Sequence, residues 1–207
     1  MSGPTLYFID DDAAIVDAVV QWAQTQCVAV RSYVSAEEFL ADDDVRAPGC
    51  IVADLKMPGL SGLELQAKLQ ERGERMPLII ISGHGDVESA VSAFRQGAVD
   101  FLTKPFDPSH LLSRVSQCFD IDQHRLETEK QTELAQQRFD TLTSRETQVF
   151  EFLVQGLAGK QIAAELGISY RTVEKFRGKV MQKMEAESVA ELVHTAFRIF
   201  SSDTGSP

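Results

Sequence analysis

Residues 5–12 read TLYFIDDD, a short apolar run that ends abruptly in three carboxylates. The run has the length and the β-branched and aromatic side chains of a buried strand. Four more runs of this kind follow along the chain, at residues 28–33, 50–54, 78–82 and 99–103. Helical patterns lie between and after them, and five strands that alternate with helices predict a parallel, doubly wound α/β sheet.

Helix-start signals separate the predicted strands. The stretches SAEE (35–38) and SGLE (61–64) have the spacing of capping boxes. Asp86 can cap a third helix, and Asp107 precedes Pro108, a residue type favoured at the first position of a helix. These signals place helices where the α/β alternation requires them.

Polar side chains stand where the predicted strands end. Asp10 and Asp11 follow the first strand, and Asp54 ends the third. Ser82 ends the fourth strand, and Lys104 follows the fifth. Because parallel strands bring their carboxyl ends to one edge of the sheet, we expect these side chains to lie close together.

The carboxylates at this edge need a physical reason, since two of them about 4 Å apart repel by roughly 4 kcal/mol at an effective dielectric of 20. Two interpretations are open: a loop that directs its charges into water, or a cation site. Carboxylates with open space between them are hard oxygen ligands suited to Mg²⁺, and a nearby hydroxyl and ammonium can hold phosphoryl oxygens. Asp12 is one carboxylate more than such a site needs, and we expect it to begin the next helix, where an acid suits the dipole.

Four motifs make a resemblance specific. They occur in the order FIDDD (8–12), DLKMPGLSG (54–62), ISGHGD (81–86) and VDFLTKPF (99–106). Together they resemble the receiver domain of bacterial two-component response regulators, over about residues 4–120. The resemblance implies a CheY-like α/β fold that carries a phosphorylated aspartate.

By this resemblance, Asp54 accepts a phosphoryl group from a sensor histidine kinase. Asp10 and Asp11 hold Mg²⁺ together with Asp54, and the backbone carbonyl of Lys56 is a further ligand. His84 and Lys56 flank the phosphoryl group in the family and tune its lifetime.

The resemblance also assigns the residues that hold the phosphoryl group. Ser82 and Lys104 bind its oxygens, and Gly83 leaves room for them. The peptide bond between Lys104 and Pro105 is cis in the family. Phe101 is the family's aromatic switch, which turns inward once Ser82 moves, although a phenylalanine in a strand is more often plain core.

No glycine or proline occurs between Ser109 and Gln155. The middle of this segment is rich in good helix formers and poor in large apolar residues. We expect the last helix of the α/β part to continue as a helical linker over residues 121–140. Three alternatives are open: pairing of this linker with a second copy, a solitary solvated helix, and a frayed tether.

The last part of the chain is predicted to be all helical. TSRE (143–146) and SVAE (188–191) have the spacing of capping boxes. Between them, a helix over residues 159–166 meets the turn GIS, and Ser169 caps a second helix that runs to about Met184. This is the spacing of a helix-turn-helix.

Residues 141–198 resemble the LuxR-type helix-turn-helix. Together with the receiver, they make the whole chain similar to FixJ-like regulators of the NarL/FixJ group. Phe176 stands where the usual pattern has His, and FixJ-like members often have an aromatic residue there. We therefore expect a receiver domain (1–120), a helical linker (121–140) and an all-α DNA-binding domain (141–207).

The total net charge of −11 argues against a nucleic-acid partner if it is taken whole. The charge is uneven, however, because residues 1–120 hold 9 basic and 18 acidic side chains, whereas residues 141–207 hold 8 of each. Between positions 160 and 183, six basic residues stand against two acids. This excess disfavours the alternative of an ordinary solvated charged face and favours a nucleic-acid interface.

The second helix of the motif carries the candidate DNA contacts. Four apolar residues share one stripe and should be buried, namely Val173, Phe176, Val180 and Met184. Six residues should then face outward, namely Arg171, Glu174, Lys175, Gly178, Lys179 and Gln182. Such a helix lies in the major groove with its N-terminal half near the base edges.

The outward residues divide by chemistry. We expect Arg171, Glu174 and Lys175 to contact bases, because Arg or Lys favours guanine and Glu can accept a hydrogen bond from cytosine. The candidates for phosphate contacts are Lys160, Thr172, Arg177 and Lys179.

Other totals exclude further classes. No apolar run approaches the length of a membrane span, and the first residues lack the pattern of a signal peptide, so we expect a cytoplasmic protein without a membrane partner. Cys27, Cys50 and Cys118 are odd in number and far apart, which argues against a disulfide framework or a zinc site. We expect all three to be small core residues.

The leading hypothesis is a phosphorylation-controlled transcription factor. Phosphorylated Asp54 would draw in Ser82 and Lys104 and promote a homodimer or free the DNA-binding helix. The family implies promoter DNA and RNA polymerase as partners, and activation more often than repression. Two alternatives are a phosphatase with Asp54 as its nucleophile and a receiver that only binds proteins. The absence of a visible substrate pocket disfavours the phosphatase, and the acid–Ser–Lys set disfavours a receiver that only binds proteins. We therefore expect that the protein is not an enzyme and that it only accepts and loses its own phosphoryl group.

Overall fold

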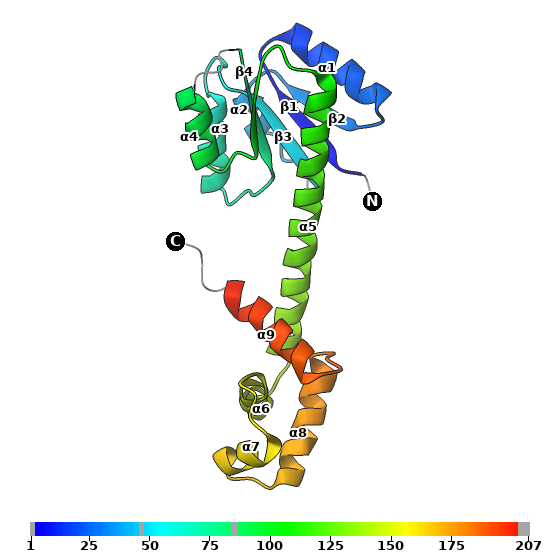
Figure 1. Ribbon diagram of the computed structural model, residues 1–207, viewed down its shortest axis with the longest axis vertical. Helices are drawn as coiled ribbons and strands as arrows, with labels where there is room; N and C mark the ends of the chain where they lie inside the picture. Colours follow the sequence, from blue (N-terminus) through cyan, green and yellow to red (C-terminus); the bar gives the residue numbers. More distant parts are fainter. Residues whose placement is uncertain (1–2, 46–47, 84–86, 203–207) are drawn as a thin grey trace. The chain divides into compact units, whose positions relative to one another are not determined.

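The computed structural model describes residues 3–45, 48–83 and 87–202 (Figure 1). The chain divides into two compact units, Met1–Leu126 and Glu127–Pro207. Asp86 and His84, for which a helix cap and a place beside the phosphoryl group were predicted, lie outside the described residues.

The first unit is built on a five-stranded parallel sheet with the strand order β2-β1-β3-β4-β5. Its strands are β1 (Thr5–Ile9), β2 (Ala29–Tyr33), β3 (Gly49–Asp54), β4 (Leu78–Ser82) and β5 (Asp100–Thr103). Every residue of β3 and β4 is buried, as expected for the central strands of a sheet that is covered on both faces. The predicted doubly wound sheet is confirmed.

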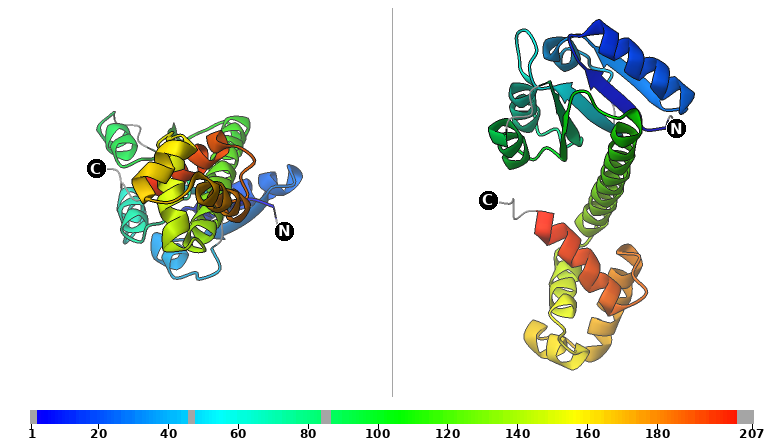
Figure 2. Two further views of the ribbon diagram at one scale, coloured as in Figure 1. Left: turned by 90° about the horizontal axis from the view of Figure 1, so that it is seen from below. Right: turned by 45° about the horizontal axis from the view of Figure 1, so that its top comes forward.

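Helices cover both faces of this sheet (Figures 1 and 2). They are α1 (Ala13–Thr25), α2 (Ala36–Leu40), α3 (Gly62–Glu71), α4 (Val87–Arg95) and the beginning of α5 (Pro108–Asp140). Leu6 and Phe8 of β1 belong to the core under α1 and α5, whereas Tyr7 and Ile9 belong to the core under α2, α3 and α4. This alternation follows the two-residue period of a strand.

The helix caps mostly follow the predicted signals. The Asp12 carboxylate accepts a hydrogen bond from the backbone N–H of Ala14 at 2.9 Å, so Asp12 begins α1 as expected. The capping box of SGLE (61–64) is complete. In SAEE (35–38), the Ser35 hydroxyl caps the helix, but Glu38 accepts a hydrogen bond from the backbone of Val34 rather than from that of Ser35.

One prediction about the cysteines is wrong. Cys50 and Cys118 are buried in the core under α1 and α5, but Cys27 is exposed. Cys27 follows the end of α1 with a φ of 57°, the left-handed conformation that ends many helices. Its side chain is exposed and does not belong to the core.

Helix α5 is 33 residues long and includes the whole predicted linker. Val115 and Cys118 pack in the first unit, whereas Ala135 and Phe139 pack in the core of the second. Leu134, between these contacts, is 36% exposed. The helical conformation of the linker is as predicted, and its pairing stays a prediction.

The second unit is all helical. Its further helices are α6 (Ser144–Val154), α7 (Gly159–Leu166), α8 (Tyr170–Lys183) and α9 (Val189–Ser202). Helix α8 packs against α6 and α7, and α9 packs against α6. Gly167 ends α7 with a φ of 65°, and the Ser169 hydroxyl caps α8, so the predicted helix-turn-helix has the expected bounds. No helix in the described part of the chain is both long and apolar enough to cross a membrane.

Candidate functional site

The carboxyl edge of the sheet brings together the polar residues that the sequence placed there. Asp10 is fully buried beyond β1, and Asp54 is 7% exposed at the end of β3. The Lys104 Nζ lies 2.6 Å from Asp10 Oδ2 and 3.3 Å from Asp54 Oδ1. Ser82, at the end of β4, is 1% exposed. The strand ends therefore form one pocket of acids with a single ammonium group among these residues.

Backbone contacts between neighbouring strands hold these side chains in place. The Lys104 N–H donates to the carbonyl of Ser82 at 2.7 Å, which fixes the segment after β5 beside the end of β4. Asp10 Oδ1 accepts a hydrogen bond from the Asp12 N–H at 3.0 Å, so one Asp10 oxygen stabilises the turn while the other binds Lys104. The parallel topology therefore brings the strand ends together, and a local turn after β1 orients Asp10.

The charge on Asp54 is unfavourable where it stands. Burial raises the pKa of the Asp54 carboxyl, the Lys104 ammonium opposes this shift, and the Asp10 carboxylate adds to it. Asp54 Oδ1 is buried and accepts no hydrogen bond from any residue in the described ranges. A carboxylate oxygen in this position is available to a cation or to a reacting group.

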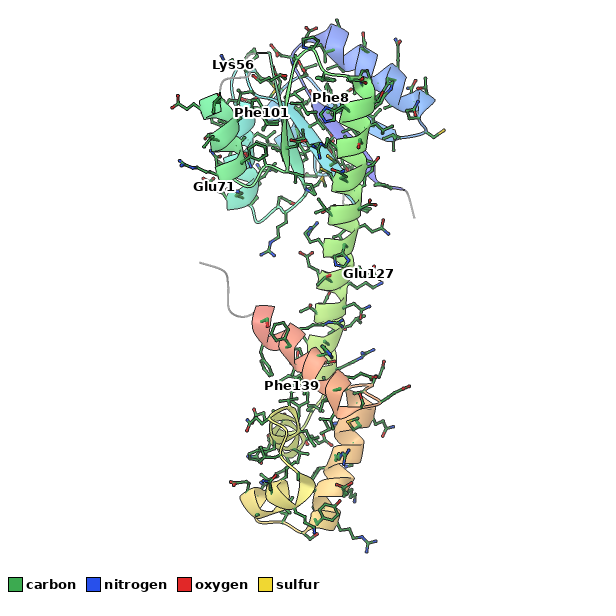
Figure 3. The ribbon with its side chains drawn as sticks, viewed as in Figure 1. Phe8, Lys56, Glu71, Phe101, Glu127 and Phe139 are labelled. Atoms are coloured by element: carbon green, nitrogen blue, oxygen red, sulfur yellow. The ribbon has the colours of Figure 1, made fainter. Side chains whose placement is uncertain are left out.

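Three carboxylates at this edge fit a metal ion. Oxygen atoms of Asp10, Asp11 and Asp54 all lie within 4.8 Å of one another, and Asp11 is exposed. This set of carboxylate oxygens suits a hard divalent cation such as Mg²⁺, which keeps several of its waters. Lys56, whose carbonyl was predicted as a ligand, follows Asp54 by two residues and has an exposed side chain (Figure 3).

The remaining predicted receiver residues lie around the pocket. A methyl group built on Gly83 would meet no described atom within 4 Å, so the described residues leave space in front of Gly83. The Lys104–Pro105 peptide bond is cis, as the resemblance implied. Phe101 on β5 is half-buried and packs against the core under α2, α3 and α4 (Figure 3).

A cavity of about 510 Å³ lies beside Lys104, between α1 and the segment that leads into α5. Its lining is mainly apolar and includes Ile15, Trp22 and Phe106. The cavity and the acidic pocket therefore share the Lys104 side chain.

Helix α8 presents the second candidate site. Val173, Val180 and Met184 are buried as predicted, while Phe176 is only half-buried and packs against the rim of the same core. Five of the six predicted outward residues are exposed, namely Arg171, Lys175, Gly178, Lys179 and Gln182. Lys160, on the neighbouring α7, is exposed as well. These residues form a basic surface on α7 and α8.

Three polar residues of α8 have contacts inside the protein. Thr172 is half-buried, and its hydroxyl lies 2.8 Å from the Ser169 Oγ. Glu174, predicted to face outward, is half-buried, and Arg177 Nη1 lies 3.8 Å from its Oε1. Thr172, Glu174 and Arg177 are therefore less free than a helical projection suggests.

Lys183, counted in the basic excess of the sequence, is a structural residue. Its Nζ lies 2.6 Å from Glu146 Oε2 and donates to the Thr141 carbonyl at 2.8 Å. The hydrogen bonds from Lys183 and from the Thr143 backbone lower the pKa of the Glu146 carboxyl to about 2. This ion pair joins the end of α8 to the start of α6.

Sequence reasoning missed two residues of this surface. Tyr170, the first residue of α8, is 51% exposed and lies against Gly159, the first residue of α7. Neither residue belongs to an apolar or basic period, so periodicity gave no signal for them. The position of Tyr170 directly after the cap residue Ser169 was the one available indication.

Two family models match the chain. A model described as "Response regulator receiver domain" matches residues 6–116, and one described as "Bacterial regulatory proteins, luxR family" matches residues 140–196. The first contains the acidic pocket, and the second contains α6, α7 and α8 with most of α9.

Characterised relatives cover nearly the whole chain. The response regulator protein TmoT of Ectopseudomonas mendocina is 39% identical over 95% of this chain and 90% of its own length. The transcriptional regulatory protein FixJ of Azorhizobium caulinodans is 43% identical over 92% of this chain and 90% of its own.

Solved structures agree with these matches. The response regulator StyR has a TM-score of 0.83 at 35% identity, covering 94% of this chain and 98% of its own. Full-length FixJ from B. japonicum has a TM-score of 0.60 at 37% identity, covering 97% of this chain and 99% of its own.

Proposed function

Because the chain belongs to the NarL/FixJ-type response regulators, which join a receiver domain to a LuxR-type DNA-binding domain, we propose that phosphorylation of Asp54 controls its binding to promoter DNA. The chain is a transcription regulator of a two-component system. The proposal adds the residue that is phosphorylated, the roles of its neighbours and the step that phosphorylation controls.

The observation that carries the proposal is the state of Asp54. Its Oδ1 is buried without a hydrogen bond from the described residues and lies 3.3 Å from Lys104 Nζ. An Asp54 oxygen attacks the phosphorus of a phosphohistidine on the sensor kinase. The new bond joins this oxygen to phosphorus, the nitrogen–phosphorus bond breaks, and the imidazole keeps the electron pair and takes up a proton.

The neighbours of Asp54 stabilise the charge that this transfer gathers. Lys104 and Ser82 hold the phosphoryl oxygens, and the open space at Gly83 accommodates them. Asp10 and Asp11 would hold Mg²⁺ together with Asp54.

The carbonyl of Lys56 is a further proposed ligand of Mg²⁺. When bound, the ion neutralises charge on the transferring group. The repulsion among the carboxylates at this edge of the sheet is tolerated because a bound cation offsets it.

The signal then leaves through the face around β5. Ser82 and Lys104 move toward the phosphoryl group, Phe101 turns inward, and the cis Lys104–Pro105 segment follows its lysine. The changed surface favours a homodimer. A shift from mostly inactive to mostly active molecules needs on the order of 5 kcal/mol of differential stability.

The DNA contacts come from α7 and α8. We assign base contacts to Arg171 and Lys175, which are exposed in the N-terminal half of α8. The residues assigned to phosphate contacts are Lys160, Thr172, Arg177 and Lys179. One such module binds weakly at physiological salt, so two joined modules on adjacent half-sites gain affinity through effective concentration.

We assign one role to each of three parts of the chain. Residues 1–120 receive the phosphoryl group, residues 141–207 bind DNA, and residues 121–140 link these two domains. The family supplies RNA polymerase as the further partner, activation as the more common output and the cytoplasm as the place of action. In this proposal the protein is not an enzyme: it accepts and loses only its own phosphoryl group, which serves as the regulatory signal.

Intact mass spectrometry tests the central claim. The full chain is incubated with acetyl phosphate and Mg²⁺ beside two variants, Asp54→Asn and Asp12→Asn, of which the second changes an exposed helix cap. We expect one added phosphoryl group in the wild type and in Asp12→Asn, and none in Asp54→Asn. Addition to Asp54→Asn, or DNA binding that responds to the phosphodonor in that variant, would overturn the assignment.

A further inference from the structure

The first residue of α7 and the first turns of α8 meet in a contact that has no room for a side chain. A methyl group built on Gly159 would lie 2.8 Å from Tyr170 Cε2 and 3.1 Å from Glu174 Oε1. Non-bonded carbon atoms prefer separations of about 3.5–4.0 Å, so such a methyl group would displace the Tyr170 ring. Tyr170 and Glu174 are four residues apart and therefore share one face of α8.

The Glu174 carboxylate is held by this contact. Its Oε1 is buried and accepts no hydrogen bond from any residue that the structure describes, yet the side chain as a whole is 39% exposed. Arg177 Nη1 lies 3.8 Å from Oε1, one turn along the same helix. The oxygen therefore lies beside Gly159 at the start of α7 and near Arg177.

The charge of Glu174 has a reason within the protein. The cap residue of α7 is Ala158, which has no side-chain oxygen for the free N–H groups of the first turn. A carboxylate beside Gly159 lies in the favourable field of that helix end, and the Arg177 guanidinium adds a second positive neighbour. These neighbours account for an acid on an otherwise basic surface.

We propose that Glu174 is a positioning residue of the DNA interface: with Gly159 and Tyr170 it fixes how α8 lies on α7, and it contacts no base. The proposal rests on the proposed DNA-binding function. It replaces the expectation from the sequence that Glu174 accepts a hydrogen bond from cytosine. Base discrimination in the N-terminal half of α8 then depends on Arg171 and Lys175.

The isosteric variant Glu174→Gln separates the two roles. If Glu174 is a positioning residue, the preferred DNA sequence stays the same, because Gln keeps the shape of the Glu174 side chain. The loss of one negative charge raises affinity for specific and non-specific DNA by the same factor, about threefold. If Glu174 contacts a base, Glu174→Gln would instead change the preference at one base pair toward adenine, by tenfold or more.

Variants of the contact test the positioning itself. Gly159→Ala forces the Tyr170 ring away from α7 and loosens the contact between α7 and α8, so we expect the ratio of specific to non-specific affinity to fall about tenfold over all base pairs near Arg171 and Lys175. Glu174→Ala lowers this ratio in the same uniform way. The double variant Gly159→Ala/Tyr170→Ala removes the obstructing ring and recovers most of the ratio.

The full chain is treated with acetyl phosphate and Mg²⁺ and is used to select its preferred sequence from a pool of randomised DNA duplexes. Its affinities for the selected duplex and for a scrambled duplex are then measured at one salt concentration. Arg171→Gln is the base-contact control and should lose preference at a single base pair. Thermal unfolding shows which variants are folded. The proposal is supported if Glu174→Gln selects the same sequence as the wild type and Gly159→Ala has a lower ratio of specific to non-specific affinity.

Two results overturn the positioning role alone: a changed preference at one base pair in Glu174→Gln, or an unchanged ratio in Gly159→Ala. Failure of the wild type to enrich any sequence overturns the proposed DNA-binding function and the positioning role with it. The position of the failure, in the wild type or in the variants, therefore distinguishes the two claims.

Discussion

The Asp122 carboxylate on α5 accepts a hydrogen bond at 2.9 Å from the backbone N–H of Gly49, the first residue of the strand that ends in Asp54. Asp122 is fully buried, and its other oxygen accepts hydrogen bonds from Arg125 Nε at 2.9 Å and Nη2 at 2.7 Å. The strand that carries the candidate phosphoacceptor is therefore bound at its opposite end to α5.

Replacement of Asp122 by Ala should lower the free energy of unfolding of the first unit by about 2–3 kcal/mol. The change removes the buried acceptor of the Gly49 N–H and the Asp122 oxygen to which Arg125 donates. Asp122→Asn keeps an acceptor for Gly49 and should cost less. Urea unfolding followed by circular dichroism measures the change, and the exposed Asp120→Ala on the same helix is the control.

Replacement of Asp54 by Asn should raise the free energy of unfolding by about 1 kcal/mol when no divalent cation is present. Burial and the Asp10 carboxylate disfavour the Asp54 charge, as its raised pKa shows, and Asn removes that charge. Urea unfolding with a chelator present measures the effect. Added Mg²⁺ should stabilise the wild type more than the variant, and an equal response of both proteins would contradict the metal assignment.

Replacement of Cys27 by Gly should raise the free energy of unfolding by about 0.5–1 kcal/mol. The φ of Cys27 is 57°, a conformation that glycine adopts without the steric cost of a Cβ. The adjacent Gln26 has a φ of −94° and supplies the control, since Gln26→Gly should destabilise the protein. Thermal unfolding midpoints of the two variants should thus move in opposite directions.

The Glu146–Lys183 ion pair should make the second unit sensitive to acid. The pKa of Glu146 is lowered from 4.5 to about 2, so its stabilising effect is complete above pH 4.5 and is lost as the pH falls through about 2. Glu146→Gln should cost about 2 kcal/mol near pH 6, and the difference from the wild type should shrink toward pH 2.

Hydrogen exchange of peptides from α6 and α8, followed by mass spectrometry over this pH range, measures the second unit by itself. A constant difference between wild type and Glu146→Gln would show that the carboxylate does not stabilise the fold through its charge.

Much of the fold was predictable because it depends on repeated local patterns. The five apolar runs became strands within one residue of their predicted bounds, and the helix-turn-helix has its predicted start at Gly159 and cap at Ser169. The acidic pocket followed from topology alone, since parallel strands must place Asp10, Asp54 and Lys104 at one edge.

The errors have a common physical origin. The burial of Cys27 and the freedom of Glu174 were inferred from position along an element. Each was decided instead by a contact with another element or by the conformation of one residue at a helix end. The hydrogen bond from Gly49 to Asp122 joins residues far apart in the chain, and no local pattern predicts it.

Trp22 is the only tryptophan in the sequence, and it lines the cavity that Lys104 also borders. Excitation at the long-wavelength edge of the indole absorption, where tyrosine does not absorb, therefore selects the first unit. A rearrangement of Lys104 reshapes the cavity that Trp22 lines, so we expect arrival of a phosphoryl group to change the indole fluorescence, which stopped flow can time. The molecule carries its own spectroscopic reporter for the event that is proposed to control it.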